Sequence, residues 1–254
     1  MPLPNAKHAT ASTRPPKAVL FDAFGTLLDV YSVGLKAEQL FPGQGARLAQ
    51  VWRDKQIEYS RLVTTSDHGA HYIAFWELTQ RALQYAIELI ANNQEYIRAN
   101  GQFDPKNTVA AVPTLMNEYR HLSAFPENRE VLLALKKQGI VTGILSNGDP
   151  AMLDVAVKSA GLQDVLDHVI SVDSIRKYKT HPDAYALGSD ATGLQPKQIL
   201  FVSANGWDAL AATWFGYRTL WVNRAGLPWE TFDTQPTRVG TSLRDALTFF
   251  KAPN

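Results

Sequence analysis

Four short motifs of the sequence place polar, reactive side chains directly after apolar runs. The first is DAFGT, in which Asp22 ends the run AVLF and Thr26 follows it by four residues. A carboxylate at the carboxyl end of a buried strand lies where open α/β sheets bind ligands. Taken alone, however, Asp22 is more typical of a turn or a helix N-cap.

The other three motifs repeat this arrangement later in the chain. VTGILSNG, YKTHPDAY and ILFVSANGWDA each carry polar residues at or beyond the end of an apolar run. The residues of interest are Ser146, Asn147, Lys179, Tyr185, Ser203, Asn205 and Asp208. Parallel strands bring their carboxyl ends to one edge of a sheet, so these side chains are expected to meet there. A lysine in such a cluster offsets like charges that would otherwise raise a carboxylate pKa.

The elements that must position these residues follow from the alternation of apolar runs and amphipathic segments after residue 127. This alternation is typical of βαβ units and a mostly parallel sheet. We expect strands at residues 18–24, 141–146, 167–172, 199–204 and 217–222. We expect helices at residues 127–138, 150–160, 182–192, 207–215 and 243–250. Gly139, Gly161, Gly193 and Gly216 follow the first four helices, where left-handed caps belong.

Residues 31–121 have a different pattern, with apolar residues at intervals of three and four over long stretches. The runs at 46–63 and 71–90 are the clearest examples and predict helices. The sequence therefore predicts an α/β fold, a Rossmann-like parallel-sheet core with an inserted helical cap domain. The predicted core comprises residues 17–30 and 122–254, and residues 1–16 are predicted to form a disordered tail.

Composition excludes several classes of protein. The chain has 254 residues, 45% of them hydrophobic and 19% charged, a net charge of +1 and no cysteine. The spread of basic residues gives no reason to expect nucleic acid, and no apolar run is long enough to span a membrane. Disulfide frameworks and thiolate chemistry are excluded. The polar first sixteen residues lack the apolar stretch of a secretory signal, which predicts a cytoplasmic protein.

Taken together, DAFGT, ILSNG, YK ahead of PDAY and FVSANGWDA resemble the four motifs of the haloacid dehalogenase superfamily, in the same order. The cap segment WRDKQIEYS is similar to that of the L-2-haloacid dehalogenase branch. This resemblance implies hydrolysis of short 2-haloalkanoic acids, including haloacetates, to 2-hydroxy acids through an aspartyl ester. It implies a 2-haloacid substrate, a halide product, no metal, no organic cofactor and a homodimer.

The resemblance also implies a role for each candidate residue. Asp22 would be the nucleophile, and Asp208 would position or deprotonate the water that hydrolyses the ester. The residues that orient the nucleophile and prepare the water would be Thr26, Ser146, Lys179, Tyr185, Ser203 and Asn205. The halide would be held by Arg53, Asn147 and Phe75. The apolar wall around the substrate would be Phe24, Ile57, Phe75 and Trp207.

Two other functions are compatible with parts of this pattern. A superfamily phosphatase carries a second aspartate two residues after the nucleophile, to protonate the leaving alkoxide, where this chain has Phe24. A phosphatase also holds magnesium partly through acidic residues after the fourth strand, whereas SANGWD contains only Asp208. Both differences favour dehalogenation, since a halide leaves without a proton. A non-catalytic member that binds an anion or a partner is the other alternative.

Some individual residues have simpler interpretations or depart from the dehalogenase pattern. Arg53 is also compatible with a solvated charge that pairs with Asp54 or Glu58. Asp54 replaces a familiar glutamine, and a pair with Arg53 would weaken the hold of Arg53 on a halide. Phe75 and Trp207 are as compatible with the core as with a pocket. The remaining departures are Phe24 in place of tyrosine, Thr180 in place of proline and Gly206 in place of alanine.

Overall fold

The computed structural model describes residues 14–250, so most of the predicted tail at residues 1–16 lies outside the described residues. Its centre is a parallel sheet of six strands in the order β3-β2-β1-β4-β5-β6. The strands are β1 (Ala18–Phe21), β2 (Val141–Ser146), β3 (His168–Ser171), β4 (Ile199–Ser203), β5 (Arg218–Val222) and β6 (Arg238–Gly240). All residues of β1 and β4 are buried, which explains their continuous apolar sequences.

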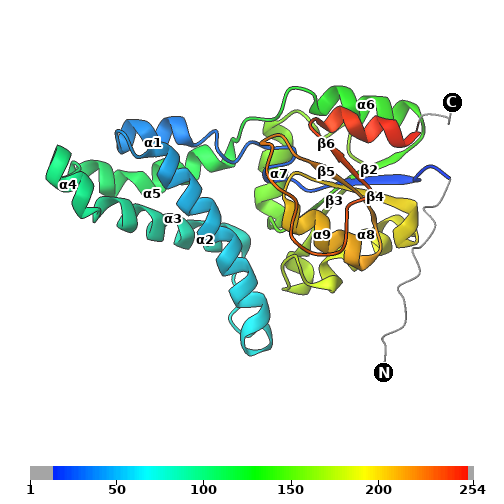
Figure 1. The fold of residues 1–254 in the computed structure, drawn as a ribbon, viewed down its shortest axis with the longest axis horizontal. Coiled ribbons are helices and arrows are strands. Elements are labelled where there is room, and N and C mark those ends of the chain that lie inside the picture. The colour runs from blue at the N-terminus through cyan, green and yellow to red at the C-terminus, as the bar shows by residue number, and fades with distance from the viewer. Residues whose placement is uncertain (1–13, 251–254) are drawn as a thin grey trace.

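Helices cover both faces of this sheet, as the alternating pattern predicts. The helices that follow the insert are α6 (Asn128–Lys137), α7 (Pro150–Ser159), α8 (Pro182–Thr192) and α9 (Gly206–Phe215). α6 lies on one face with the C-terminal segment, and α8 and α9 lie on the other (Figure 1). The four glycines predicted as left-handed caps have φ of 64° to 109°. The predicted α/β fold with a parallel sheet is therefore confirmed.

The structure corrects the sequence prediction at the C-terminal end. Residues 243–250, predicted as a helix, form the 3₁₀ helix η4 (Leu243–Phe250). The short edge strand β6 was not predicted, because two of its three residues are exposed and it lacks an apolar run. The remaining 3₁₀ turns are η1 (Ser66–Gly69), η2 (Val172–Ile175) and η3 (Pro196–Gln198).

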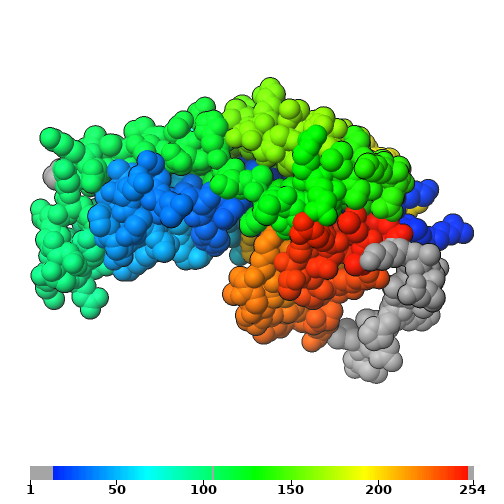
Figure 2. Space-filling model, turned by 90° about the horizontal axis from the view of Figure 1, so that it is seen from above, coloured from blue at the N-terminus to red at the C-terminus, as the bar shows by residue number. Residues whose placement is uncertain are grey.

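Between β1 and α6 the chain forms a helical insert that extends from one side of the sheet (Figures 1 and 2). It contains α1 (Gly34–Leu40), α2 (Gly45–Thr65), α3 (Phe75–Ala91), α4 (Gln94–Asn100) and α5 (Pro105–Arg120). α2 packs along α3, and the indole N–H of Trp52 donates to the carbonyl oxygen of Thr79 at 2.8 Å. α3 begins four residues later than predicted, because Ala74 has an extended backbone and serves as its N-cap.

Among residues 14–250, no helix combines the length and the apolar character that crossing a lipid bilayer requires.

Candidate active site

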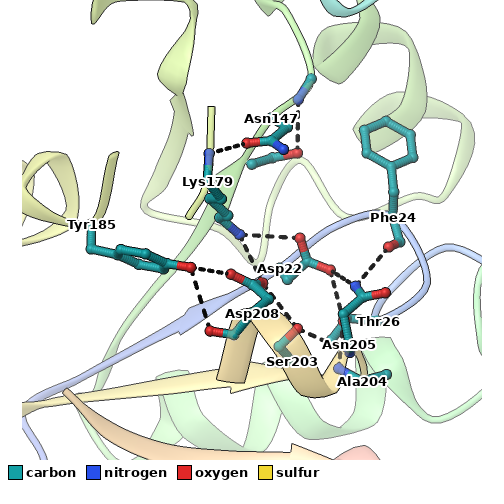
Figure 3. A network of polar contacts seen from close by, with 12 residues as sticks. Asp22, Phe24, Thr26, Asn147, Lys179, Tyr185, Ser203, Ala204, Asn205 and Asp208 are labelled. Carbon is teal, nitrogen blue, oxygen red and sulfur yellow. Dashed lines mark hydrogen bonds and ion pairs between the residues drawn. The ribbon is translucent and has the colours of Figure 1, made fainter. Parts of the chain in front are cut away.

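The carboxyl ends of the central strands bring the predicted core residues into one polar network (Figure 3). Asp22 follows β1, Ser146 ends β2 and Ser203 ends β4. β1 is paired with both β2 and β4, so these three ends are adjacent in the sheet. The parallel register thus explains why residues more than 100 positions apart meet.

The carboxylate of Asp22 is held by three donors. Its Oδ2 accepts hydrogen bonds from Thr26 Oγ1 and Asn205 Nδ2, each at 2.9 Å. Its Oδ1 accepts one from Lys179 Nζ at 3.1 Å. Asp22 is 6% exposed and lines a cavity. Oδ1, with a single donor, is therefore the less engaged of the two carboxylate oxygens.

Lys179 lies between two buried carboxylates. Its Nζ is 3.1 Å from Asp22 Oδ1 and 3.1 Å from Asp208 Oδ2, and the residue is 1% exposed. The ammonium also lies over the ring of Phe201, 4.7 Å from the centroid. One positive charge thus serves two negative charges, which is the compensation that buried carboxylates require.

Asp208 lies on the far side of Lys179 and is completely buried. It accepts hydrogen bonds from Tyr185 Oη at 2.7 Å and from Ser203 Oγ at 3.0 Å. Burial raises the pKa of Asp208, and the charge of Asp22 adds to this, whereas the Lys179 ammonium and the Tyr185 hydroxyl lower it. Burial beside Asp208 raises the pKa of Tyr185 well above its usual value, so its hydroxyl keeps the proton that it donates.

A short loop between β4 and α9 fixes the amide of Asn205. Ala204 N donates to Thr26 Oγ1 at 2.8 Å, and Asn205 N donates to Ser203 Oγ at 3.2 Å. Asn205 is the N-cap of α9, and Asp208 lies in the first turn, where the helix dipole favours an acid. The hydroxyls of Thr26 and Ser203 therefore accept hydrogen bonds from the backbone of this loop and donate hydrogen bonds to the carboxylates of Asp22 and Asp208.

The loop after β2 brings Asn147 to the same edge of the sheet. Asn147 Oδ1 accepts a hydrogen bond from Lys179 N at 2.9 Å, and Ser146 Oγ accepts one from Gly148 N at 3.1 Å. A Cβ atom at Gly148 would lie 2.8 Å from the ring of Phe24. Glycine at this position therefore allows Phe24 to pack against the loop.

Arg53 is the residue that the helical insert contributes to this network. From α2, its Nη2 donates to the carbonyl oxygen of Phe24 at 3.0 Å and to Asn205 Oδ1 at 3.2 Å. The interpretation of Arg53 as a solvated charge is wrong, because the residue is only 8% exposed.

The alternative pairing of Arg53 with Asp54 or Glu58 is also wrong. Asp54 lies on the exposed side of α2, where it accepts a hydrogen bond from Gln50 at 2.8 Å. Glu58 pairs with Lys55 at 2.8 Å. Successive residues of a helix point about 100° apart, so Asp54 faces away from the side of α2 that bears Arg53.

Two buried residues of the insert, Gln56 and Tyr119, complete the setting of Arg53 and were not predicted. Gln56 Oε1 accepts from Arg53 Nη1 at 2.6 Å, while its Nε2 donates to Thr79 Oγ1 at 2.6 Å and to Tyr119 Oη at 3.1 Å. The ring of Tyr119 stacks on Phe24 with a centroid distance of 5.6 Å. Gln56 lies three residues after Arg53 on the same face of α2, and this spacing was the available signal.

A narrow cavity lies between the insert and the strand ends, with about 10 Å³ of room for the centre of a water molecule. Its lining includes every residue predicted for the halide cradle and the apolar wall: Phe24, Arg53, Ile57, Phe75, Asn147 and Trp207. Asp22, Ser146, Gln56 and Ser60 complete the lining. The remaining candidates, Thr26, Lys179, Tyr185, Ser203, Asn205 and Asp208, form the network behind Asp22. The structure thus brings all the predicted residues together: some line the cavity beside the carboxylate of Asp22, and the others form the hydrogen-bond network that holds this carboxylate.

Two further features bear on the sequence predictions. A Cβ atom at Gly206 would lie 3.0 Å from Glu230 Oε1, so glycine instead of alanine leaves room for this carboxylate at the start of α9. Within residues 14–250, no three His, Cys, Asp or Glu side chains form a cluster suited to a metal ion.

The known proteins that this chain resembles in sequence and structure include haloacid dehalogenases. The model of a family described as haloacid dehalogenase-like hydrolase matches residues 16–216. The (S)-2-haloacid dehalogenase of Pseudomonas sp. (strain YL) is 36% identical over 235 residues, which cover 92% of this chain and 94% of that protein.

Solved structures extend the comparison to the whole fold. One L-2-haloacid dehalogenase has a TM-score of 0.84 and 50% identity, over 94% of this chain and all of its own. The L-2-haloacid dehalogenase of Xanthobacter autotrophicus, solved with chloropropionic acid covalently bound, has a TM-score of 0.77 and 34% identity. That match covers 92% of this chain and 98% of the Xanthobacter chain.

Proposed function

This chain belongs to the haloacid dehalogenase-like hydrolases, and we propose that it hydrolyses short 2-haloalkanoic acids to 2-hydroxy acids through an ester on Asp22. The observation that carries this proposal is the carboxylate of Asp22 itself. Three donors orient it, and Asp22 lines a cavity that Arg53 also lines from the insert. A similar protein with chloropropionic acid covalently bound supports a covalent route.

In the first step, Asp22 Oδ1 attacks the carbon that bears the halogen. A carbon–oxygen bond forms as the carbon–halogen bond breaks, and its electron pair leaves with the halide ion. The leaving anion needs donors or positive charge in a site from which water is excluded. Arg53, Asn147 and the ring of Phe75 line the cavity and are assigned to this role. No proton is required, which agrees with an aromatic ring at Phe24.

In the second step, water attacks the carbonyl carbon of the Asp22 ester and releases the 2-hydroxy acid. Thr26 Oγ1 and Asn205 Nδ2, which donate to Asp22 Oδ2, are placed to stabilise the oxygen that becomes negative during this attack. Lys179, which donates to Oδ1, is placed to stabilise that oxygen as it leaves with the product.

Asp208, which shares the Lys179 ammonium with Asp22, is assigned to accept one proton of the water and to return it to Oδ1, which leaves as the hydroxyl of the product. To give its proton to Asp208, the water must approach Asp208 Oδ2, which Lys179 and Ser203 now contact. Asp22 then loses the second proton to solvent and regains its carboxylate.

The assay of choice incubates the purified protein with L- and D-2-chloropropionate and measures released halide. We expect chloride from the L-enantiomer. Release from neither enantiomer, with bromo- and fluoro-acids also inert, would overturn the proposed function. A single turnover in heavy-oxygen water then tests the route: the label should enter the carboxylate of Asp22 first, whereas direct attack of water would place it in the product.

We also propose that residues 31–121 act as a cap over a core of residues 17–30 and 122–254. The support is the path of Arg53, which reaches from α2 to the carbonyl oxygen of Phe24 and to Asn205. A substrate that enters the cavity must therefore pass between the two parts.

A homodimer and a cytoplasmic location complete the proposal. Partly exposed Tyr85 and Leu89 lie one turn apart on α3 and offer apolar contact area to a second copy. Light scattering during size-exclusion chromatography would test the dimer. The composition without cysteine favours the cytoplasm, which cell fractionation would test.

A further inference from the structure

Asp149 is a buried carboxylate to which the proposed chemistry gives no role. It is 9% exposed and follows Asn147 and Gly148 in the loop after β2. Its Oδ1 accepts a hydrogen bond from Met152 N, and its Oδ2 accepts one from Trp76 N, both at 3.0 Å. The two oxygens of one side chain thus bind the backbones of α7 and α3.

The two helices depend on Asp149 in different ways. For α7, Asp149 is the ordinary N-cap residue, and a serine would serve almost as well. α3 has no such residue of its own, because its N-cap is Ala74, which makes no side-chain hydrogen bond. Asp149 therefore supplies the missing acceptor to α3 from the other side of the cavity. Its negative charge is also favoured at the positive ends of both helices.

The same two backbone segments carry two of the three residues assigned to the halide. Phe75 opens α3 and immediately precedes Trp76, whose N–H binds Asp149. Asn147 lies two residues before Asp149 in the loop. Both side chains line the cavity, and the Phe75 ring also packs against Phe24 at a centroid distance of 5.9 Å.

We propose that Asp149 is a positioning residue that sets the distance between Phe75 and Asn147, and with it the geometry of the halide cradle. This inference rests on the proposed function, which assigns both residues to the departing halide. Asp149 touches neither substrate nor product. It acts by fixing the insert to the core at the point where the two parts meet around the halide.

The sharpest test is Asp149→Ser, which separates the two roles. Serine keeps the cap of α7, but its single short hydroxyl cannot also reach Trp76 N. The matched control is Asp104→Ser, the same change at the N-cap of α5, where Asp104 accepts from Lys106 N within the insert. We expect Asp149→Ser to lower kcat/KM about tenfold, since small misplacements in active sites have effects of this order or larger.

A second measurement reports on the cradle directly. Bromide added as a product inhibitor should bind about five times more weakly to Asp149→Ser than to wild type, as expected when a preorganised anion site loosens. The Asp104→Ser protein should match wild type within about twofold, as surface caps away from a site do. Amide exchange at Trp76 should accelerate in Asp149→Ser alone, and this measurement needs no turnover.

The outcomes separate this inference from the proposed function. If wild type releases no halide from any haloacid, the proposed function fails. If wild type is active and Asp149→Ser keeps wild-type bromide inhibition and Trp76 exchange, the positioning role of Asp149 fails. Should Asp149→Ser not fold, Asp149→Asn is the substitute, because its amide nitrogen cannot accept a hydrogen bond and one of the two contacts is lost.

Discussion

The two sides of the cavity are built in different ways. On the core side, Asp22, Lys179 and Asp208 are held by strand ends and short loops, with bonds of 3.1 Å from one ammonium to both acids. On the insert side, a single long side chain, Arg53, reaches across the cavity and depends on Gln56 behind it. The difference teaches that the bond-making groups are fixed by the core, whereas the guanidinium of Arg53 is fixed by contacts between α2, α3 and α5.

This contrast predicts that core substitutions lower kcat and that insert substitutions mainly raise KM. Lys179→Met should show the largest effect. The change leaves Asp22 and Asp208 buried without their shared cation, so we expect kcat to fall about 10³-fold, as when an oxyanion donor is lost. Denaturant unfolding should show a loss of about 3 kcal/mol, typical of a broken buried ion pair.

Lys177→Met is the control for this first prediction. Lys177 lies two residues earlier but pairs with Asp183 on the surface, with both side chains substantially exposed. The control should change kcat and stability little, since exposed pairs contribute little. Equal losses in the two variants would contradict a special role for the buried ammonium.

The second prediction concerns the guanidinium group of Arg53. Arg53→Lys keeps the charge but cannot reproduce the contacts of the guanidinium with Gln56, the Phe24 carbonyl and Asn205. We expect kcat/KM to fall about 10²-fold, mostly through KM, because a misplaced anchor costs about this much. Arg47→Lys, an exposed position on the same helix, is the control and should remain active. If Arg53→Lys lowered kcat and left KM unchanged, the expected difference between the core side and the insert side of the cavity would be wrong.

The third prediction tests the support behind Arg53. Gln56→Leu removes its acceptor and also leaves Thr79 Oγ1 and Tyr119 Oη without this partner. We expect KM to rise about tenfold and stability to fall by about 1 to 3 kcal/mol, the range for buried groups left unpaired. Steady-state kinetics and urea unfolding measure both effects. Gln50→Leu, on the exposed side of α2, should change neither, and a fall in kcat alone would argue against a binding role.

The same contrast explains what could be predicted from the sequence. The core residues could be found because each follows an apolar strand, and parallel strands bring their ends to one edge. Asp22, Ser146 and Ser203 illustrate this, since they meet through the register of β1 with β2 and β4. β6 was missed because a three-residue, largely exposed edge strand carries no such signal.

The insert could be predicted only in part. Helical periodicity located α2 and α3, and Arg53 and Ile57, which lie four residues apart on one face of α2, both line the cavity. The partners of Arg53 could not be deduced, because they depend on how α2 packs against α3 and α5. Proximity in the sequence made Asp54 and Glu58 the alternative partners, whereas packing selected Gln56. The contact of Asp149 with Trp76, 73 positions away, belongs to the same class of tertiary information.

The smallest predicted effect lies at the mouth of the cavity, where the two sides meet. The guanidinium of Arg61, an exposed residue of α2, lies 5.1 Å from the ring centroid of Trp207, which lines the cavity from the core. Among residues 14–250, no carboxylate forms an ion pair with Arg61, so its charge is available to attract an anionic haloacid. Arg61→Gln should lower kcat/KM about threefold at low salt and leave kcat unchanged, as expected for electrostatic steering by one charge.

Ionic strength distinguishes this steering from a packing effect at Trp207. At about 0.5 M salt the Debye length falls to roughly 4 Å, so the difference between Arg61→Gln and wild type should vanish. Arg47→Gln removes an equal charge from the exposed surface of α2 and should change kcat/KM less at every salt concentration. If the loss in Arg61→Gln persisted at high salt, Arg61 would instead support the Trp207 wall through stacking. Activity at the mouth would then depend on packing, as it does at the walls of the cavity. The charge of Arg61 would have no part in substrate entry.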